Sequence, residues 1–587
     1  MRSRRRAPVL ILLTLSGASG VRAAHVDVQL DGLDEEMRDA VRATLELSGY
    51  EKRDISTAEL HAAYRQSDEQ IRRALEPFGF YDAQVDKSLD GDEQAGWKAH
   101  FKVTPGKPAI VRRETVQVQG EGRGQRRVAE AVAGFAPKVG DRLDHATYEA
   151  SKSVIDTSLR GAGYLDAKLT QRKVVVRPED QSADIDLAWD SGPRYRFGEV
   201  RFSGNAPFPD QFLQKFVPWQ EGDPFSSERV LTLQQRLVDA DYFELVSVQP
   251  ALDEKKDGRV PIDVLLNRDE RTVYSGEVYY STDYGPGVRL RAERRWLNRK
   301  GHKADAEIEY SSRLQEFATH YQIPRPGRQD RSYDFGAAYR DETTDTTRSR
   351  NFQLAASRTE KQWHGYTRTL GLKYFHGDFE IGKEDQPQEF GNSTLLFAEG
   401  TLNRRRLNDR LAPRRGYVFD VGLRAAADAL VSDTDFVQAF SRITWLVPQG
   451  ESGRFKFRGE AGAMTVGEFD ALPPDLRFFA GGDRSIRGFD YQEIGETNAD
   501  GVVIGGRYLA VASAEYEYYF TESWGAGVFT DAGDAFTDRF KLNASVGVGV
   551  RWRSPVGPIR VDFAFPVAHA LPLQSSWRVH VLLGPDI

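Results

Sequence analysis

The sequence predicts a membrane β-barrel of about sixteen antiparallel strands, preceded by three small β-α-α-β-β domains. Three observations predict this fold class. Helical stripes of apolar residues are confined to roughly the first 268 positions, and these positions repeat a common pattern about every 80 residues. From Thr272 onward, alternation of apolar and charged residues replaces the helical stripes. The length of 587 residues also exceeds that of one ordinary domain.

The N-terminus is typical of a secretory signal peptide. Arginines crowd positions 2–6, a short apolar run follows at positions 9–15, and small residues continue to Ala24. This order predicts a signal peptide over residues 1–24, with cleavage near Ala23 or Ala24. A membrane anchor is the alternative, but the apolar run is too short to span a bilayer.

The composition excludes several classes of protein. Charged residues make up 28% of the chain and the mean hydropathy is −0.54, so a bundle of transmembrane helices is excluded. The net charge of −7 is mild and no basic face recurs along the chain, so nucleic-acid binding is not indicated. The chain has no cysteine, and an exported protein without disulfides must be stabilised by large cores or by a membrane.

Residues 25–108, 109–193 and 194–268 are predicted to be three copies of one module. Each opens with a short strand, continues through two amphipathic stretches, and turns at an aromatic corner into two further strands. The second stretch of each copy carries the apolar stripe of a half-buried helix, at Ile71 and Leu75, at Ile155 and Leu159, and at Val230, Leu233 and Leu237. The opening strands end at Gly32, Gly120 and Gly204, and the corners hold Phe80, Tyr164 and Tyr242. Three unrelated α/β domains are the alternative, but the shared order, spacing and corner chemistry favour a repeat.

Residues 269–587 are predicted to form the barrel. In the stretch GYVFDVGLRA, Tyr417 and Phe419 share one face while Asp420 and Arg424 share the other, and SVGVGVRWRS and PIRVDFAFP repeat this pattern. A soluble sandwich also alternates, but it does not usually line its second face with charges over so many strands. Apolar-out, charged-in alternation is typical of an outer-membrane barrel, whose closed wall pairs all of its backbone. Polar inserts at 380–392 and 493–503 are expected to be surface loops.

One loop between two late strands, GGDRSIRGFDY at 481–491, carries an unusual set of residues. Its glycines permit positive φ values, so the loop can fold tightly back on itself. If Arg487 enters the barrel lumen it needs carboxylate partners, because a guanidinium removed from water is costly. The next strands supply Glu515 and Asp531 on their inward faces. The alternative is a solvated extracellular loop with scattered charges.

The motif residues of this loop are Gly481, Gly482, Ile486, Arg487, Gly488 and Phe489. The motif resembles the lid loop of outer-membrane assembly factors, the barrel insertase superfamily that includes barrel-assembly and two-partner-secretion transporters. The later stretches SAEYEYY and FTDAGDAF are similar to family patterns, and the N-terminal modules resemble POTRA repeats. The resemblance covers essentially the whole mature chain. Ile486 replaces the commoner valine, which is a conservative change.

The resemblance implies a role for each motif residue. Arg487 would pair inside the lumen with Asp531 and Glu515, which would hold the lid loop against the barrel wall. Gly488 would allow the backbone to approach the wall closely, and Phe489 would pack against it.

The number of repeats separates the branches of this superfamily. The main barrel-assembly subunit typically has five repeats, and two-partner-secretion transporters have two and a plug helix. Three repeats and the terminal stretch LLGPDI resemble the TamA branch, the barrel subunits of the translocation and assembly module. This resemblance implies a TamB-like partner anchored in the inner membrane, unfolded outer-membrane proteins as clients, and a bacterial outer-membrane location with periplasmic repeats.

The first and last barrel strands are predicted to meet at a weak lateral seam. The first strand is expected at 273–281 and the last at 577–583. The predicted seam residues are Gly276, Tyr279, Leu583, Gly584 and Pro585. Because proline cannot continue a ladder, pairing is expected to stop there and to leave edges that can template a client strand. The alternative is that the Gly-Pro pair merely ends the barrel.

The function predicted from these features is assembly of outer-membrane proteins. The protein is expected to insert and translocate clients, autotransporter-like proteins among them, through the lateral seam together with a TamB-like partner. No enzyme, cofactor or metal is predicted, since the chain shows no nucleophile elbow, phosphate loop or paired His or Cys spacing. An export pore of the two-partner-secretion type and a lipid conduit between the membranes are the alternatives. Three repeats argue against the pore, whereas the sequence does not separate lipid from protein cargo.

Overall fold

The computed structural model describes residues 25–584 except 52, 54, 93–95, 326–327, 383–388, 410–411, 556 and 571–574. The predicted signal peptide and Pro585 therefore lie outside the described residues. By its internal contacts the chain divides into two compact units, one built mainly of residues up to 199 and the other mainly of residues from 262 onward. Among the described residues, no helix has the length and apolar character needed to cross a membrane.

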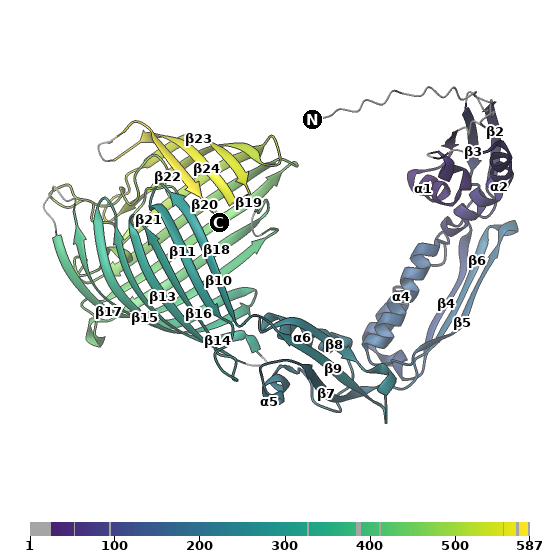
Figure 1. The fold of residues 1–587 in the computed structure, drawn as a ribbon, viewed down its shortest axis with the longest axis horizontal. Coiled ribbons are helices and arrows are strands. Elements are labelled where there is room, and N and C mark those ends of the chain that lie inside the picture. Colours follow the sequence, from purple (N-terminus) through teal and green to yellow (C-terminus); the bar gives the residue numbers. More distant parts are fainter. Residues whose placement is uncertain are drawn as a thin grey trace, which may run out of the picture. The chain divides into compact units, whose positions relative to one another are not determined.

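The first repeat is a three-stranded sheet with two helices (Figure 1). Its elements are β1 (Val26–Asp31), α1 (Glu35–Thr44), α2 (Thr57–Leu75), β2 (Gln84–Asp92) and β3 (Gly96–Thr104). The strand order is β1-β3-β2, with β1 parallel to β3. A capping box between Ser56 and Glu59 fixes the start of α2. Ile71 of the predicted stripe is fully buried in the same core as Phe101.

The second repeat has the same order of elements. They are β4 (Ile110–Gln119), α3 (Arg126–Ala133), α4 (His145–Gly161), β5 (Lys168–Arg177) and β6 (Ser182–Asp190), and the strand order is β4-β6-β5. The stripe residues Ile155 and Leu159 are completely buried in its core. Trp189 is buried with them and donates its indole N–H to Asp156 at 2.8 Å, which satisfies its one polar atom.

The third repeat has the same topology. Its elements are β7 (Arg196–Gly204), α5 (Asp210–Leu213), α6 (Ser227–Asp239), β8 (Phe243–Pro250) and β9 (Arg259–Arg268), and the strand order is β7-β9-β8. Leu233 and Leu237 of the predicted stripe are fully buried. The corner residue Tyr242 is buried as well and donates its hydroxyl to the carbonyl of Gly301, in the turn after the second barrel strand, at 2.6 Å.

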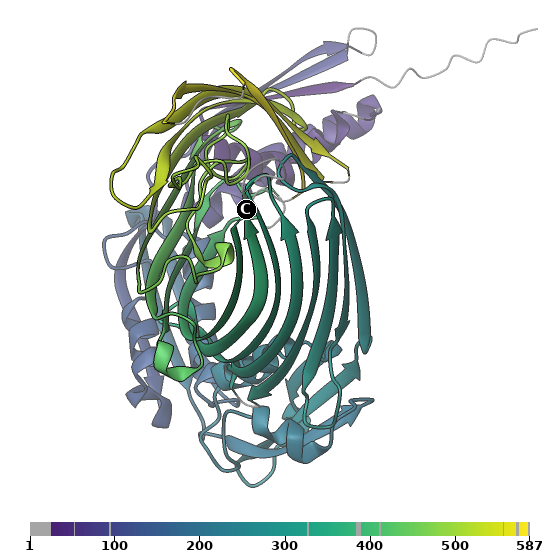
Figure 2. The ribbon, with the colours of Figure 1, turned by 90° about the vertical axis from the view of Figure 1, so that its left-hand side faces the viewer.

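The sixteen described strands β10–β25 close in chain order into an antiparallel barrel (Figure 2), so the predicted fold class is confirmed. The first eight are β10 (Thr272–Ser281), β11 (Gly285–Arg294), β12 (Lys303–Ser311), β13 (Leu314–Arg325), β14 (Arg328–Thr343), β15 (Thr347–Trp363), β16 (Tyr366–Ile381) and β17 (Glu389–Leu407). The others are β18 (Gly416–Ala426), β19 (Phe436–Gln449), β20 (Gly453–Val466), β21 (Tyr508–Tyr519), β22 (Trp524–Phe536), β23 (Asn543–Ser554), β24 (Gly557–Ala568) and β25 (Arg578–Leu583).

The barrel wall is apolar on its outer face and charged on its inner face. On β23, the side chains of Val546, Val548 and Val550 are 42%, 52% and 43% exposed, whereas Arg551 is only 3% exposed. Strand geometry sends successive side chains to opposite faces, so this alternation separates a lipid-facing surface from a charged lumen.

The two polar inserts differ from the expected surface loops. β16 and β17 remain paired as far as Ile381 and Glu389, so the first insert extends a hairpin and its loop is shorter than expected. The second insert belongs to the segment 467–507 between β20 and β21, which is drawn in yellow-green coil in Figure 2. Ile494 and Val502 in this segment are 3% and 4% exposed. These apolar residues anchor the insert, while its residues 499–501 remain exposed.

Candidate functional site: the lid loop and the barrel seam

The loop 481–491 lies within the segment 467–507 between β20 and β21, and it folds back against the barrel wall. Gly481, Gly482 and Gly488 have φ values of +102°, +104° and +102°, a region that other residues rarely adopt. A β-carbon at Gly488 would lie 3.1 Å from the β-carbon of Ser545 on β23. Glycine therefore permits both the turn and the close approach of the loop to the wall.

Two apolar side chains of the loop are buried on either side of Arg487. Ile486 is 0% exposed and Phe489 is 4% exposed. Both belong to one apolar cluster with Phe478 and Ile494, which come from the same long segment. This packing supplies the apolar part of the loop's attachment, at roughly 25 cal/mol for each Å² of apolar surface removed from water.

Arg487 is completely buried and is surrounded by carboxylates. Its Nε donates to Asp531 at 2.7 Å and one terminal nitrogen donates to the second oxygen of the same carboxylate at 2.9 Å. The other terminal nitrogen donates to Glu515 at 2.8 Å and to Asp562 at 3.0 Å. The guanidinium carbon also lies 3.4 Å from the ring centre of Phe529. Two parallel bonds to one carboxylate and a stacked aromatic ring fix the orientation of the guanidinium.

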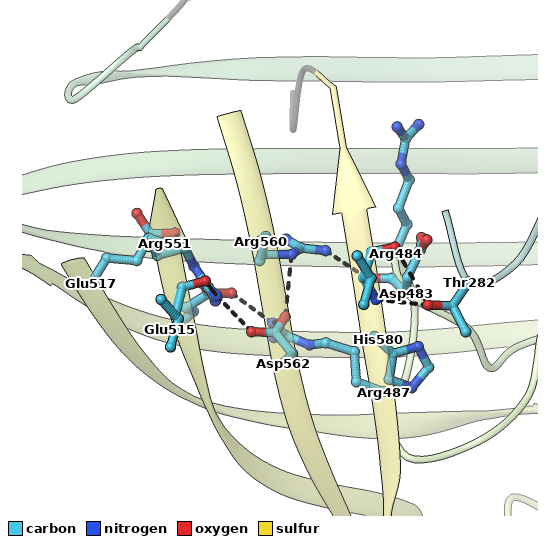
Figure 3. A network of polar contacts seen from close by, with 12 residues as sticks. Thr282, Asp483, Arg484, Arg487, Glu515, Glu517, Arg551, Arg560, Asp562 and His580 are labelled. Atoms are coloured by element: carbon cyan, nitrogen blue, oxygen red, sulfur yellow. Dashed lines mark hydrogen bonds and ion pairs between the residues drawn. The ribbon is translucent and has the colours of Figure 1, made fainter. Parts of the chain in front are cut away.

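A second buried arginine, Arg551, joins the same carboxylates (Figure 3). It donates to Asp562 at 2.6 Å and to Glu517 at 3.1 Å, and it also pairs with Glu515. Arg560 adds a further pair with Asp562 at 3.2 Å. The cluster therefore alternates positive and negative groups, so each buried charge has a partner that offsets part of its desolvation cost.

The structure brings together the residues that the motif predicted and adds others. Arg487, Asp531 and Glu515 lie in direct contact, and Asp562 and Arg551 were not predicted as partners. The alternation along β23 and β24 predicts that both side chains face inward. Which inward side chains touch depends on the register between distant strands. That information is not present in any single strand. Among the described residues, no group of side chains could hold a metal ion.

The lid loop also contacts the last strand, β25. The backbone N–H of Gly488 donates to Nε2 of His580 at 3.1 Å. Arg578 forms an ion pair with Asp490 and a second one with Glu493 at 3.5 Å. One edge of the barrel is thus held directly by the loop.

The same loop contacts the turn that follows the first barrel strand, β10. The backbone N–H of Asp483 donates to the carboxylate of Asp283 at 2.9 Å, and the hydroxyls of Tyr284 and Tyr491 lie 2.7 Å apart. Burial, together with the facing charge of Asp483, raises the pKa of Asp283 from 3.8 to about 8. The lid loop therefore holds both sides of the seam.

The seam itself is short. Within the described residues, β10 pairs with β25 only at Tyr280 opposite Leu583 and Ser281 opposite Leu582, whereas its other edge pairs with β11 along its whole length. Beyond the strand, the backbone N–H of Thr282 donates to the carbonyl of Val581 at 3.0 Å. Residues 272–279 of β10 have no partner on the part of β25 that the structure describes.

The other predicted seam residues take different positions. Gly276 lies opposite Leu290 of β11, within the unpaired edge. Tyr279 donates its hydroxyl to Glu309 of β12 at 2.6 Å, and a β-carbon added at Gly584, just after β25, would lie 4.0 Å from the β-carbon of Tyr279. Gly584 has a φ of +133° and donates its N–H to Pro558 at 3.1 Å. The paired positions Tyr280 and Ser281 face Leu583 and Leu582 directly, so they suit cysteines meant to cross-link this seam.

A closed barrel with a charged lumen, an inward-folded lid loop and N-terminal repeats defines a class of outer-membrane barrel proteins with periplasmic domains. The profile of the Omp85 superfamily domain matches residues 297–584, that of the first POTRA domain of TamA matches residues 27–105, and that of a POTRA-type surface antigen repeat matches residues 195–268. The chain belongs to the Omp85 superfamily. Its barrel lies in the outer membrane and its POTRA repeats lie in the periplasm.

Known relatives agree with this assignment. The chain is 24% identical over 419 residues to the outer membrane protein assembly factor BamA of Nitratidesulfovibrio vulgaris, an alignment that covers 69% of this chain and 53% of that protein. It thus spans about half the length of that relative. It is 22% identical over 581 residues to BamA of Neisseria meningitidis serogroup B, covering 86% of this chain and 70% of that protein.

A solved structure shares the fold. BamA from Haemophilus ducreyi lacking POTRA domains 1–3 superposes with a TM-score of 0.68 at 18% identity. The superposition covers 81% of this chain and 99% of the other. At this identity the similarity concerns the fold alone.

Proposed function

We propose that this protein is a non-enzymatic outer-membrane assembly factor that inserts client β-strand proteins through the seam between β10 and β25. The observation that carries the proposal is the edge of β10 at residues 272–279, which has no strand partner in the part of the C-terminal segment that the structure describes. The two BamA relatives are outer membrane protein assembly factors, which supports the same class of function.

The unpaired edge provides the chemistry for templating a strand. In hydrocarbon, each backbone N–H or C=O group without a partner costs several kcal/mol, roughly the desolvation cost of the group. An extended client segment that added to β10 would satisfy these groups by strand addition. Tyr274 and Val278 project from this strand with 79% and 72% of their surface exposed, and a client strand would cover part of that surface.

The lid loop is proposed to regulate opening of the seam. It contacts the turn beside β10 through Asp283 and the strand β25 through His580 and Arg578. Arg487 attaches the same loop to the wall at Asp531, Glu515 and Asp562. We infer that release of Arg487 loosens both edges at once, so that the docked loop keeps the seam shut between clients.

The periplasmic partner is proposed from the first repeat. Its match to the first POTRA domain of TamA supports a TamB-like partner anchored in the inner membrane, which would contact that repeat. Each POTRA sheet has an outer strand, and such edges bind extended segments of partners or clients. Autotransporter-like proteins are proposed among the clients.

Folding of a urea-unfolded small barrel into liposomes tests the proposal. Liposomes that contain this protein should accelerate folding over empty liposomes, and Arg487→Ala should abolish the acceleration. Arg484→Ala is the matched control, because Arg484 belongs to the same loop but is exposed. Absence of acceleration by the folded protein, with and without a TamB-like partner, would favour an export pore or a lipid conduit instead.

A further inference from the structure

The outer wall of β16–β19 carries arginines as well as apolar residues. Leu372, Leu423 and Trp445 project from this wall and are 55%, 54% and 53% exposed. Register places Arg404 of β17 opposite Phe419 and Arg406 opposite Tyr417 on β18, on the face that Leu423 shares. Because side chains alternate between the two faces, Arg404 and Arg406 point toward the lipid and Arg405 between them points into the lumen.

These two arginines lie at the periplasmic end of the wall. β17 ends at Leu407, and the barrel chain enters at this end, where β10 starts directly after the third periplasmic repeat. Aromatic side chains such as Tyr366, Tyr417 and Trp445 lie at the same end of their strands. A girdle of aromatic residues marks the level of the lipid headgroups on outer-membrane barrels.

Arg404 is held in a defined position by aromatic rings. Its guanidinium carbon lies 5.0 Å from the ring centre of Tyr366 and 5.8 Å from that of Tyr417. The group also lies beside Gly365 in the hairpin turn, where an added β-carbon would be 3.4 Å from it. Stacking on the rings therefore orders the guanidinium, and its N–H donors, which bond no group in the part of the chain that the structure describes, are available to an anion.

Neither Arg404 nor Arg406 forms an ion pair with any residue that the structure describes. By contrast, an arginine on the neighbouring strand β16 of the same wall does have a carboxylate partner. Arg368 donates to Glu360 at 2.7 Å, and Arg331 pairs with the same carboxylate. A guanidinium at the headgroup level that lacks a carboxylate takes its counter-charge from the lipid.

We propose that Arg404 and Arg406 bind the phosphate of one acidic phospholipid in the periplasmic leaflet. An acidic headgroup, such as that of phosphatidylglycerol, brings a net negative charge to two adjacent guanidiniums. A phosphatidylcholine headgroup carries its own ammonium, which competes with the arginines for the phosphate. The site thus selects acidic lipids over zwitterionic ones, and it is independent of the proposed insertion activity.

Native mass spectrometry of the detergent-purified full chain tests the site. The protein is titrated with phosphatidylglycerol or phosphatidylcholine, and the fraction that retains one lipid is measured. With about 1 kcal/mol for each arginine, R404Q should lower retention of phosphatidylglycerol about fivefold and R404Q/R406Q about 25-fold. Retention of phosphatidylcholine should not change.

Three comparisons make the result decisive. R405Q, which changes the lumen-facing neighbour on the same strand, should retain phosphatidylglycerol like the wild-type protein. A shift in gel mobility upon boiling shows that each variant is folded. R404K/R406K should recover part of the retention, because lysine keeps the positive charge but lacks the planar guanidinium that stacks on the rings. Wild-type retention by R404Q/R406Q would overturn the proposal, as would equal retention of both lipids. Displacement of the lipid by the same concentration of inorganic phosphate would assign the site to free phosphate.

Discussion

Arg487 is held by three carboxylates, and two of these three also bind Arg551. At the scale of single residues, the cluster is therefore a network in which the removal of any one charge leaves another without compensation. Taking one partner out of a buried ion pair usually costs about 3–5 kcal/mol, far more than an exposed pair contributes. The position of the loop depends on this asymmetry.

Arg487→Ala is expected to weaken docking of the lid loop by about 3–5 kcal/mol, because buried carboxylates lose their partner. The barrel itself should remain folded, since its strand ladders do not involve the loop. The rate of chymotrypsin cleavage after Phe489, which is 4% exposed in the docked loop, measures the change. Arg484→Ala should leave that rate unchanged, and equal protection of Phe489 in both variants would contradict the role of Arg487.

Asp562→Asn tests the partner that the motif did not reveal. The substitution removes a negative charge from beside Arg487, Arg551 and Arg560, so it should also speed cleavage after Phe489. In the Arg487→Ala background the same change relieves an excess of negative charge. The double variant should therefore lose less docking free energy than the sum of the two single changes, by about 0.5–3 kcal/mol. Strict additivity would show that Asp562 does not act through Arg487.

At the scale of elements, the lid loop connects β25 to the turn between β10 and β11. This turn and β25 are distant in sequence but adjacent across the seam. The contact with the turn passes through Asp283, whose carboxyl is protonated near neutral pH because its pKa is about 8. A group whose pKa is raised on docking contributes fully below its ordinary value of 3.8, and its contribution falls as pH rises toward about 8.

The contact between the lid loop and this turn is therefore expected to loosen between about pH 4 and pH 8 and to change little at higher pH. A spin label on Arg484→Cys reports the mobility of the loop, and the chain has no other cysteine. Asp283→Asn keeps a neutral side chain of the same shape, so it should remove the pH dependence. An identical pH response in the two proteins would assign the titration to another group.

Many of the strands and helices, and the faces that they bury, were predicted from the sequence. Period-two alternation identified the barrel strands and their inward faces, and the stripes at Ile155 and Leu159 identified the helices of the repeats. The motif also led to Arg487 and its partners Asp531 and Glu515. The contact of Asp483 with Asp283 could not be predicted, because it depends on where the closed wall places a turn 200 residues away. The burial of Ile494 escaped for a similar reason, since its cluster forms only when the segment folds inward.

At the scale of the whole molecule, the chain combines a barrel whose wall is closed almost everywhere with repeats whose sheets have free edges. Neighbouring strands such as β16 and β17 pair along fifteen positions from Thr367 to Ile381, whereas β10 and β25, as far as the structure describes them, pair at Tyr280 and Ser281 only. Closure elsewhere follows from the need to satisfy backbone groups in lipid. The seam is the exception, and the proposed insertion of clients requires the seam to open.

A reversible cross-link of the seam tests whether client insertion requires β10 and β25 to separate. Cysteines at Tyr280 and Leu583, which lie opposite each other, would form a disulfide that locks β10 to β25. A matched lock at Val528 and Val548 joins two fully paired strands of the same wall. With the oxidised seam lock, the rate of client folding into liposomes should fall to that of empty liposomes and recover upon reduction, while the matched lock should have no effect. Undiminished client insertion with the oxidised seam would contradict the account.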